Sequence, residues 1–121
     1  MSTVLLIADS EWVINDVHAT LSSPDREIVV LNDPVLVSAT AADVKPDVAV
    51  IDLQVGAMGG MAIVRELHDG QALGQVPHFP TVLLLDRTAD RFLARRSGAN
   101  ASVVKPFSAQ ELRSAVTRIL L

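Results

Sequence analysis

Short apolar runs alternate along this chain with segments in which apolar residues recur every three or four positions. The first run, 4–8, is apolar throughout, which is typical of a strand that is covered on both faces. The periodic segments predict amphipathic helices with one apolar stripe, so the chain reads as repeated βα units. The expected strands are 4–8, 27–31, 48–51, 81–85 and 101–104, and the expected helices are 11–21, 34–43, 61–69, 89–97 and 109–119.

Local signals mark several helix ends. Asp33 followed by Pro34 predicts an N-cap with proline at the first helical position. Gly98 is expected to end a helix as its C-cap. Ser108 and Glu111 have the spacing of a capping box that opens the last helix.

Charged residues directly follow the first, third and fifth expected strands. Right-handed crossovers turn alternating strands and helices into a doubly wound parallel α/β sheet, although the pattern leaves the strand order open. Asp9, Asp52 and Lys105 then meet at the edge where such sheets bind ligands. Lys105 is one of only two lysines in the chain. A carboxylate from one strand facing a lysine from another is therefore the best indication of function.

The composition narrows the class of protein. The 121 residues suit one domain, half of them are apolar, and the net charge of −4 argues against a general nucleic-acid binder. Without cysteine there is no disulfide, thiolate metal site or cysteine nucleophile. No apolar run approaches the roughly 20 residues that span a bilayer. Because the amino terminus enters a strand without a basic stretch, we expect a cytoplasmic protein.

Several motifs, taken in order, resemble those of the receiver domain of bacterial response regulators, the CheY-like superfamily. A set of motifs in the right order is far more specific than any one alone. The matching segments are 7–11, 46–53, 58–60, Pro80, 98–99 and 105–107.

The resemblance implies a flavodoxin-like sheet of five strands in the order 2-1-3-4-5, with five helices. We expect a single receiver domain over residues 1–121, with no output domain, that signals and is not an enzyme. Asp52 would take a phosphoryl group from the phosphohistidine of a histidine kinase. Lys105 would pair with Asp52 at rest and with the phosphoryl group afterwards.

The resemblance also implies a Mg²⁺ site. A carboxylate that attacks phosphorus needs a positive charge to offset the phosphoryl oxygens, and Mg²⁺ prefers oxygen ligands. By resemblance, its protein ligands are Asp9, Asp52 and the backbone carbonyl of Gln54.

The chain departs from the family pattern at several site positions. Ser10 stands where the family has a second acid, and even the loss of an outer-shell partner costs roughly 10–100-fold in metal affinity. Leu85 replaces a hydroxyl residue, for which Thr88 is the alternative. Asp86 occupies a position that is usually small, where a carboxylate repels a phosphoryl group. Ser102 replaces the aromatic switch residue.

A cluster of arginines lies on and before the fourth expected helix, and two of them, Arg91 and Arg95, share a face. This cluster is either a solvated face or a partner surface, since arginine is enriched at binding hot spots. The cluster consists of Arg87, Arg91, Arg95 and Arg96. We expect the lone tryptophan, Trp12, to pack at the start of the first helix. The histidines have no metal-ligand spacing; they are His18, His68 and His78.

These features predict a stand-alone, atypical receiver that works by binding a protein partner, as a monomer or weak homodimer. The first alternative is a conventional Mg²⁺-dependent relay receiver. A small-ligand α/β module is a second alternative, although the loop after the first strand has no glycine-rich phosphate cradle. The simplest structural alternatives are a solvated strand end for Asp52, a helix N-cap for Asp9 and a solvated loop charge for Lys105.

Overall fold

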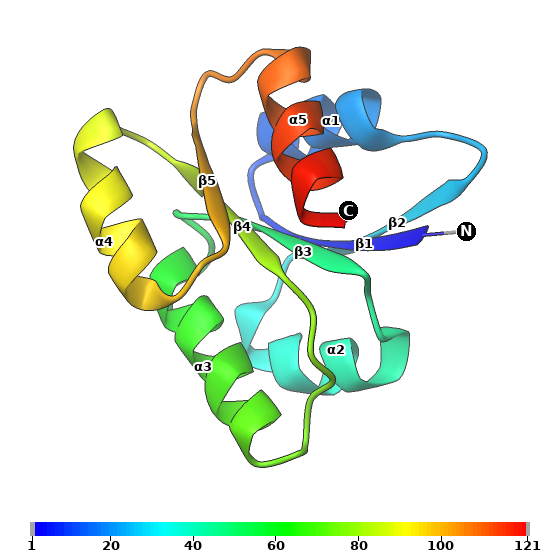
Figure 1. The fold of residues 1–121 in the computed structure, drawn as a ribbon, viewed down its shortest axis with the longest axis vertical. Helices are drawn as coiled ribbons and strands as arrows, with labels where there is room; N and C mark the ends of the chain where they lie inside the picture. The colour runs from blue at the N-terminus through cyan, green and yellow to red at the C-terminus, as the bar shows by residue number, and fades with distance from the viewer. Residues whose placement is uncertain (1, 121) are drawn as a thin grey trace.

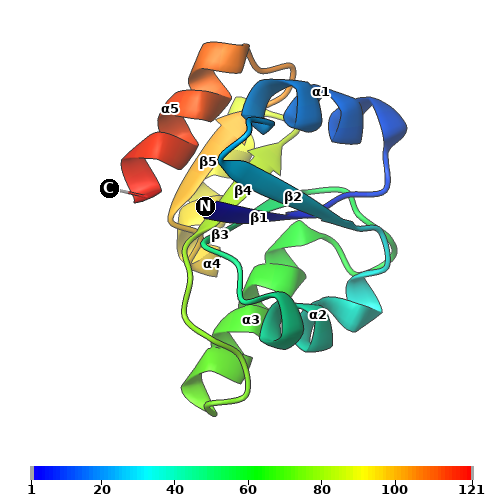
Figure 2. The same ribbon diagram turned by 90° about the vertical axis from the view of Figure 1, so that its right-hand side faces the viewer.

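The computed structural model describes residues 2–120 and contains a parallel five-stranded sheet between two layers of helices (Figures 1 and 2). The strand order is β2-β1-β3-β4-β5, which confirms the expected fold and topology. The strands are β1 (Ser2–Ile7), β2 (Arg26–Leu31), β3 (Val48–Asp52), β4 (Thr81–Leu85) and β5 (Ala101–Val104). The helices are α1 (Glu11–Leu21), α2 (Val37–Val44), α3 (Gly60–Ala72), α4 (Arg91–Ser97) and α5 (Ala109–Leu120), with short 3₁₀ turns η1 (Pro34–Leu36) and η2 (Thr88–Asp90).

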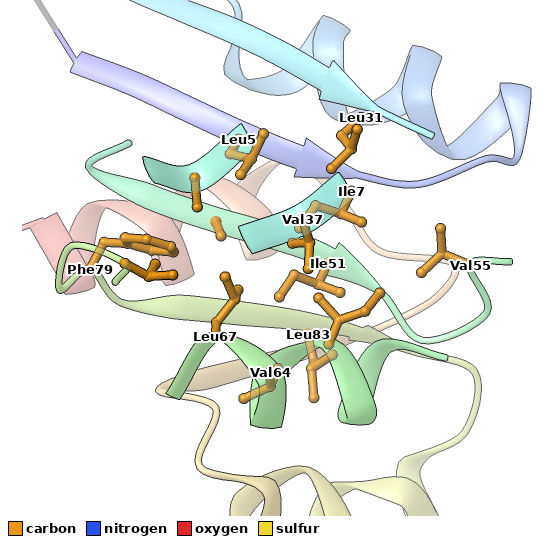
Figure 3. Close-up of a cluster of buried hydrophobic side chains, with 14 of the residues drawn as sticks. Leu5, Ile7, Leu31, Val37, Ile51, Val55, Val64, Leu67, Phe79 and Leu83 are labelled. Carbon is orange, nitrogen blue, oxygen red and sulfur yellow. The ribbon is translucent and has the colours of Figure 1, made fainter. Parts of the chain in front are cut away.

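The sheet separates two hydrophobic cores. Figure 3 shows the core beneath α2 and α3, and α1 and α5 cover the opposite face. Strand β3 contributes to both, because Ala49 and Ile51 belong to one core while Val48 and Val50 belong to the other. All of β3 is buried, which explains why its sequence is apolar up to Asp52.

Two of the expected helices begin with a separate 3₁₀ turn. The side chain of Asp33 accepts a hydrogen bond from the backbone N–H of Val35 at 3.2 Å, as an N-cap should, but it caps η1. Leu36 leaves helical geometry before α2 starts. The prediction of a single helix over 34–43 is therefore wrong in its first turn. The segment 89–97, which was also expected to be one helix, is likewise divided between a 3₁₀ turn and α4.

The other helix signals are confirmed. Gly98 adopts the left-handed conformation, with φ +96°, directly after α4. The N–H of Glu111 donates to the hydroxyl of Ser108 at 3.1 Å, and the N–H of Ser108 donates to the carboxylate of Glu111 at 3.4 Å. This reciprocal pair is the predicted capping box.

Backbone contacts hold the carboxyl ends of the strands together. The N–H of Leu53 donates to the carbonyl of Leu84 at 2.9 Å, and the N–H of Lys105 donates to the carbonyl of Leu85 at 2.7 Å. Gly60 begins α3 so close to β3 that a Cβ atom there would lie 2.6 Å from the carbonyl oxygen of Asp52. The residues that follow β3, β4 and β5 therefore share one edge of the sheet.

Within residues 2–120, no helix has the length and apolar character required to cross a membrane. Trp12 is 50% exposed on α1, so the prediction that it packs is wrong. The buried face of α1 is formed by Val13, Val17 and Leu21 instead.

Candidate functional site

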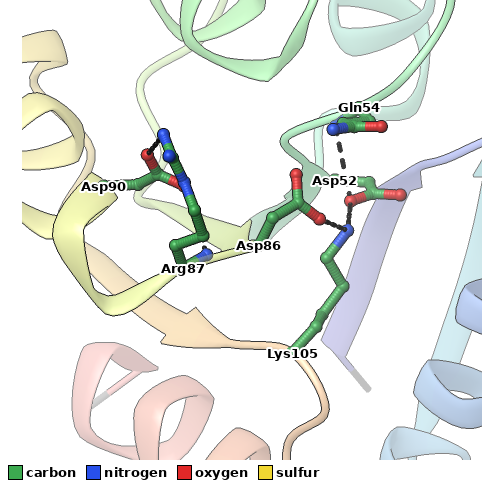
Figure 4. Close-up of polar contacts among 6 residues, drawn as sticks. All are labelled: Asp52, Gln54, Asp86, Arg87, Asp90 and Lys105. Carbon is green, nitrogen blue, oxygen red and sulfur yellow. Dashed lines mark hydrogen bonds and ion pairs between the residues drawn. The ribbon is translucent and has the colours of Figure 1, made fainter.

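Lys105 is held between two carboxylates at the carboxyl edge of the sheet (Figure 4). Its ammonium group donates a hydrogen bond to Oδ1 of Asp52 and lies 3.0 Å from Oδ1 of Asp86. The side chains of Lys105 and Asp52 are 8% and 2% exposed, whereas that of Asp86 is 33% exposed. The structure thus brings together the predicted acid and lysine, which come from different strands.

The two carboxylates determine the protonation of this lysine. Burial by itself would lower the pKa of Lys105, but hydrogen bonds and charge attraction from Asp52 and Asp86 outweigh it and raise the pKa above the ordinary 10.5. Lys105 is therefore a fixed cation at physiological pH. With two carboxylates against one ammonium group, the trio carries a net negative charge.

Asp86 is part of the site, which the sequence alone did not establish. Its Oδ1 pairs with Lys105, while Oδ2 is buried and has no hydrogen-bond partner among residues 2–120. Buried carboxylate oxygens are normally hydrogen-bonded, so this oxygen is an exception within the site. Its position directly after β4 allows it to reach the lysine at the end of β5.

Asp9 is oriented by the loop between β3 and α3. Its Oδ2 accepts a hydrogen bond from the backbone N–H of Gly56 at 2.8 Å. The N-cap of α1 is Ser10, whose side chain makes no capping hydrogen bond, so the N-cap alternative for Asp9 is wrong. Gly56 has φ +56°, and a Cβ atom there would lie 2.8 Å from the ring of Pro34. Sequence reasoning missed this glycine, although three glycines between positions 54 and 60 were a signal.

The candidate metal ligands at this edge are all oxygen atoms, which suits Mg²⁺. Asp9, Asp52 and the backbone carbonyl of Gln54 are the candidate ligands, and the N–H of Gln54 approaches Oδ1 of Asp52 at 3.5 Å. Ser10 adds no charge. Among residues 2–120, no group of three histidine, cysteine or acidic side chains could hold a metal ion. The chemistry of this candidate donor set suits a magnesium ion, with two carboxylates where the family pattern would supply three.

Among residues 2–120, none of the remaining site positions forms a hydrogen bond with the side chain of Lys105. Leu85 is fully buried in the core beneath α2 and α3 and offers no hydroxyl. Thr88 is exposed at the start of η2. Ser102 is partly buried on β5.

The arginine cluster has two parts. Arg87 forms an ion pair with Asp90 at 3.0 Å, and its N–H donates to the same carboxylate at 3.2 Å, so it helps to close η2. Sequence reasoning missed this role of Asp90. The other three arginines are exposed on α4, where Arg96 lies over the ring of Phe92, 5.8 Å from its centroid.

The family model described as "Response regulator receiver domain" matches residues 4–117. The chain belongs to this family. Receiver domains are modules of two-component signalling that interact with histidine kinases, and they are not enzymes in their own right. The family assignment agrees with the strand order and with the acid–lysine pair at the edge of the sheet.

Similar proteins come from several bacteria. The chain is 31% identical, over 90% of its length and 41% of the relative, to the transcriptional regulatory protein TrcR of Mycobacterium tuberculosis. Among solved structures, it is similar to the chemotaxis response regulator CheY4 of Vibrio cholerae, with 25% identity, 98% coverage of both chains and a TM-score of 0.82. The receiver domain of sensor histidine kinase PA1611 from Pseudomonas aeruginosa, solved with magnesium in its active-site cleft, shares the fold at 21% identity, a TM-score of 0.82 and coverage of 98% of this chain and 97% of that one. The chain spans about half the length of the curated relatives that it matches.

Proposed function

We propose that this chain is an atypical receiver that acts mainly by binding a protein partner. Asp52 is its phosphoacceptor position, and a histidine kinase is the donor. The observation that carries the proposal is the sharing of Lys105 between Asp52 and Asp86. A lysine that is already paired with two carboxylates is less available to a phosphoryl group.

Phosphoryl uptake at Asp52 requires positive charge around the oxygens of the incoming group. An oxygen of Asp52 would attack phosphorus, the P–N bond would break, and the histidine nitrogen would leave with the electron pair. Lys105 stabilises the charge of the product. Asp86 opposes this, because it repels the phosphoryl oxygens and competes for the same ammonium group.

Metal binding is expected to be weak. Asp9, Asp52 and the backbone carbonyl of Gln54 would hold Mg²⁺, which would offset phosphoryl charge when bound. The serine at position 10 removes a carboxylate from this set. The hydrogen bond from Gly56 keeps the carboxylate of Asp9 aimed at the loop that follows β3.

A switch needs the phosphoryl group to favour one of two conformations. Leu85 has no hydroxyl to bind that group, and Ser102 has no ring to move with it. Partner binding should therefore depend on surfaces that are present without phosphorylation. The exposed arginines of α4 and the neighbouring Arg87 are the proposed partner surface.

A conventional Mg²⁺-dependent relay is the second candidate. The retained hydrogen bond between Lys105 and Asp52 favours it. Incubation with phosphoramidate, with and without Mg²⁺, separates the two candidates when wild type is compared with Asp52→Asn. Fast, Mg²⁺-dependent labelling that Asp52→Asn abolishes would support the relay. We expect labelling to be slow and to respond weakly to Mg²⁺.

A further inference from the structure

Strand β2 forms one outer edge of the sheet, with α1 on one side and α2 on the other (Figure 2). It pairs only with β1, and this pairing runs without a bulge from Arg26 to Leu31. Edge strands are normally protected by lysine, proline, a bulge or a covering segment, because their free backbone groups pair readily with other chains. Residues 26–31 contain no lysine and no proline. We call this feature the β2 edge; it consists of residues 26–31.

The hydrogen bonds of β2 identify the backbone groups that point outward. The carbonyl of Leu31 accepts a hydrogen bond from the N–H of Ala8, at the end of β1, at 3.1 Å. Backbone groups of successive residues in a strand point to opposite sides, so Val29 also faces β1 whereas Ile28 and Val30 face away. In the part of the chain that the structure describes, the N–H and C=O groups of Ile28 and Val30 have no hydrogen-bond partner. They are free to pair with another strand.

The charged residues of the β2 edge do not block it. The guanidinium group of Arg26 donates to the hydroxyl of Ser2 at 3.3 Å and to the carbonyl of Leu21 at 3.2 Å, so it is held inside the molecule. Glu27 is exposed and forms no ion pair with any residue from 2 to 120. The β2 edge therefore offers one uncompensated negative charge.

Apolar side chains flank the free backbone groups. Val30 is 41% exposed, so no other segment covers the strand at this point. Ile28 and Val29 are half-buried and pack at the margins of the two cores, one on each face of the sheet. A strand laid beside β2 would cover Val30 and extend both apolar faces. Such a strand needs apolar residues in alternation.

The surroundings of the β2 edge are strongly acidic. Residues 11–44, which contain α1, β2, η1 and α2, include six acidic residues and one basic residue, a net charge of −5. The whole chain carries −4, so the rest of it carries +1. This concentration of negative charge attracts a basic segment and repels an acidic one.

We propose that the β2 edge binds an extended, basic segment of a partner protein, which pairs with β2 as an additional strand. The backbone of the segment hydrogen-bonds to Ile28 and Val30. Its apolar residues cover Val30, and the lysines or arginines between them face the acidic surroundings that include Glu27. In recognition of this kind, backbone hydrogen bonds supply affinity and alternate side chains supply specificity. The proposal goes beyond the proposed function and does not depend on it, because it uses neither Lys105 nor the arginines of α4.

The direct test is fluorescence anisotropy with fluorescein-labelled short peptides. The first peptide alternates valine and lysine, the second adds a methyl group to each backbone nitrogen, and the third has glutamate in place of lysine. A fourth contains the residues of the first in separate blocks. We expect the first to bind at least about tenfold more tightly than the others, because only it combines hydrogen bonds, alternation and positive charge. A second, third or fourth peptide that binds as tightly as the first would overturn the proposal.

Amide hydrogen exchange, followed by nuclear magnetic resonance, locates the bound peptide. The N–H groups of Ile28 and Val30 should exchange at least about tenfold more slowly when the first peptide is bound. The N–H of Val29, which faces β1, should change much less. The other edge strand, β5, is the control, and its amide groups should exchange as they do without peptide. Unchanged exchange at Ile28 and Val30 would overturn the proposal, whatever the affinity.

A proline in the strand tests the backbone pairing. Val30→Pro removes an outward N–H and leaves the pairing with β1 in place, because proline is tolerated where the N–H of an edge strand faces solvent. It should weaken binding of the first peptide by about tenfold. Val30→Ile, which keeps the N–H and a branched apolar side chain, should bind as wild type does. Circular dichroism verifies that both variants fold. Unchanged binding in Val30→Pro would refute the location.

A charge reversal tests the electrostatic part. Glu27→Lys should weaken binding of the first peptide by about tenfold, because it replaces an attractive charge by a repulsive one. Asp69→Lys, the same change in charge at an exposed position near the end of α3, is the matched control and should leave binding unchanged. Equal losses of affinity in the two variants would contradict the proposed position of the basic segment.

A second copy of this chain is the alternative occupant. Pairing of two β2 edges would bring together two regions that each carry −5, and their repulsion opposes it. Sedimentation of wild type and Val30→Pro tests this occupant. We expect wild type to be monomeric at low ionic strength. A dimer that Val30→Pro removes would overturn the proposal in favour of self-association.

The two proposals fail separately. Asp52→Asn should bind the first peptide as wild type does, because the β2 edge does not include the Lys105 site. Fast labelling at Asp52 with intact peptide binding would contradict the proposed function alone. Slow labelling without peptide binding would contradict the role of the β2 edge alone.

Discussion

The ammonium group of Lys105 lies 3.0 Å from Oδ1 of Asp86, although the same lysine donates a hydrogen bond to Asp52. One cation therefore serves two carboxylates from adjacent strand ends, as Figure 4 shows. Asp52 is almost completely buried, whereas a third of the Asp86 side chain reaches solvent. Asp52 therefore depends more on Lys105 for charge compensation than Asp86 does.

Asp86→Ala should increase the rate at which phosphoramidate labels Asp52. The substitution removes a repelling carboxylate and frees Lys105 for the phosphoryl group. We expect an increase on the order of tenfold, which corresponds to about 1.4 kcal/mol in the activation barrier. Asp69→Ala, an exposed position near the end of α3, is the matched control. Unchanged labelling in Asp86→Ala would show that Asp86 does not restrain the site.

Lys105→Met should lower the free energy of unfolding by about 3 kcal/mol, because it leaves Asp52 buried without a counter-charge. Urea unfolding at neutral pH measures the loss. The only other lysine, Lys45, is exposed at the end of α2, and Lys45→Met should change stability by less than about 0.5 kcal/mol.

A double-mutant cycle isolates the contribution of the pair. In an Asp52→Asn background, Lys105→Met should lower the free energy of unfolding by much less, since no buried charge remains on residue 52. An equal loss of stability in both backgrounds would mean that Lys105 stabilises the fold through packing or through Asp86, and not through Asp52.

The raised pKa of Lys105 predicts a loss of stability at high pH. A group that binds its proton more tightly in the folded state contributes stability in full below its unfolded pKa and loses it as pH rises through the folded pKa. Burial alone would lower the pKa, but the contacts with Asp52 and Asp86 raise it above 10.5. The stability difference between wild type and Lys105→Met should therefore stay constant up to about pH 10.5 and shrink above it. A difference that grows with alkaline pH would contradict this sign.

Ser10→Asp should strengthen Mg²⁺ binding by roughly 10–100-fold, because it supplies a carboxylate that the metal site lacks. Trp12, two residues along the chain and the only tryptophan, is an intrinsic fluorescent reporter for the titration. Calorimetry gives the affinity independently. Ser10→Asn, which adds a similar volume without charge, should bind Mg²⁺ no better than wild type. An equal gain in Mg²⁺ affinity in both variants would show that the added negative charge is not its cause.

The sequence predicted most of the fold because the buried strands are mostly apolar. The apolar run that ends at Asp52 indicated a central strand, and the run before Lys105 indicated another at the same edge. The strand order came only from the family resemblance, since periodicity carries no information about which strands are neighbours. Trp12 was misplaced because it lies one residue before Val13, where the buried stripe of α1 begins.

The contacts of the site could not be predicted in the same way. The pairing of Asp86 with Lys105 and that of Asp9 with Gly56 depend on loop conformations, which leave no periodic signal in the sequence. The division of the helix after Asp33 depends on the backbone angles of Leu36.

The rate of labelling at Asp52 tests the central claim most directly. Wild type, Asp52→Asn and the double variant Ser10→Asp/Asp86→Ala should be compared, with phosphoramidate and saturating Mg²⁺, to a conventional receiver that has both acids and the hydroxyl. The account predicts slow labelling of wild type, faster labelling of the double variant, and none in Asp52→Asn. Labelling of wild type as fast as that of the conventional receiver would contradict it.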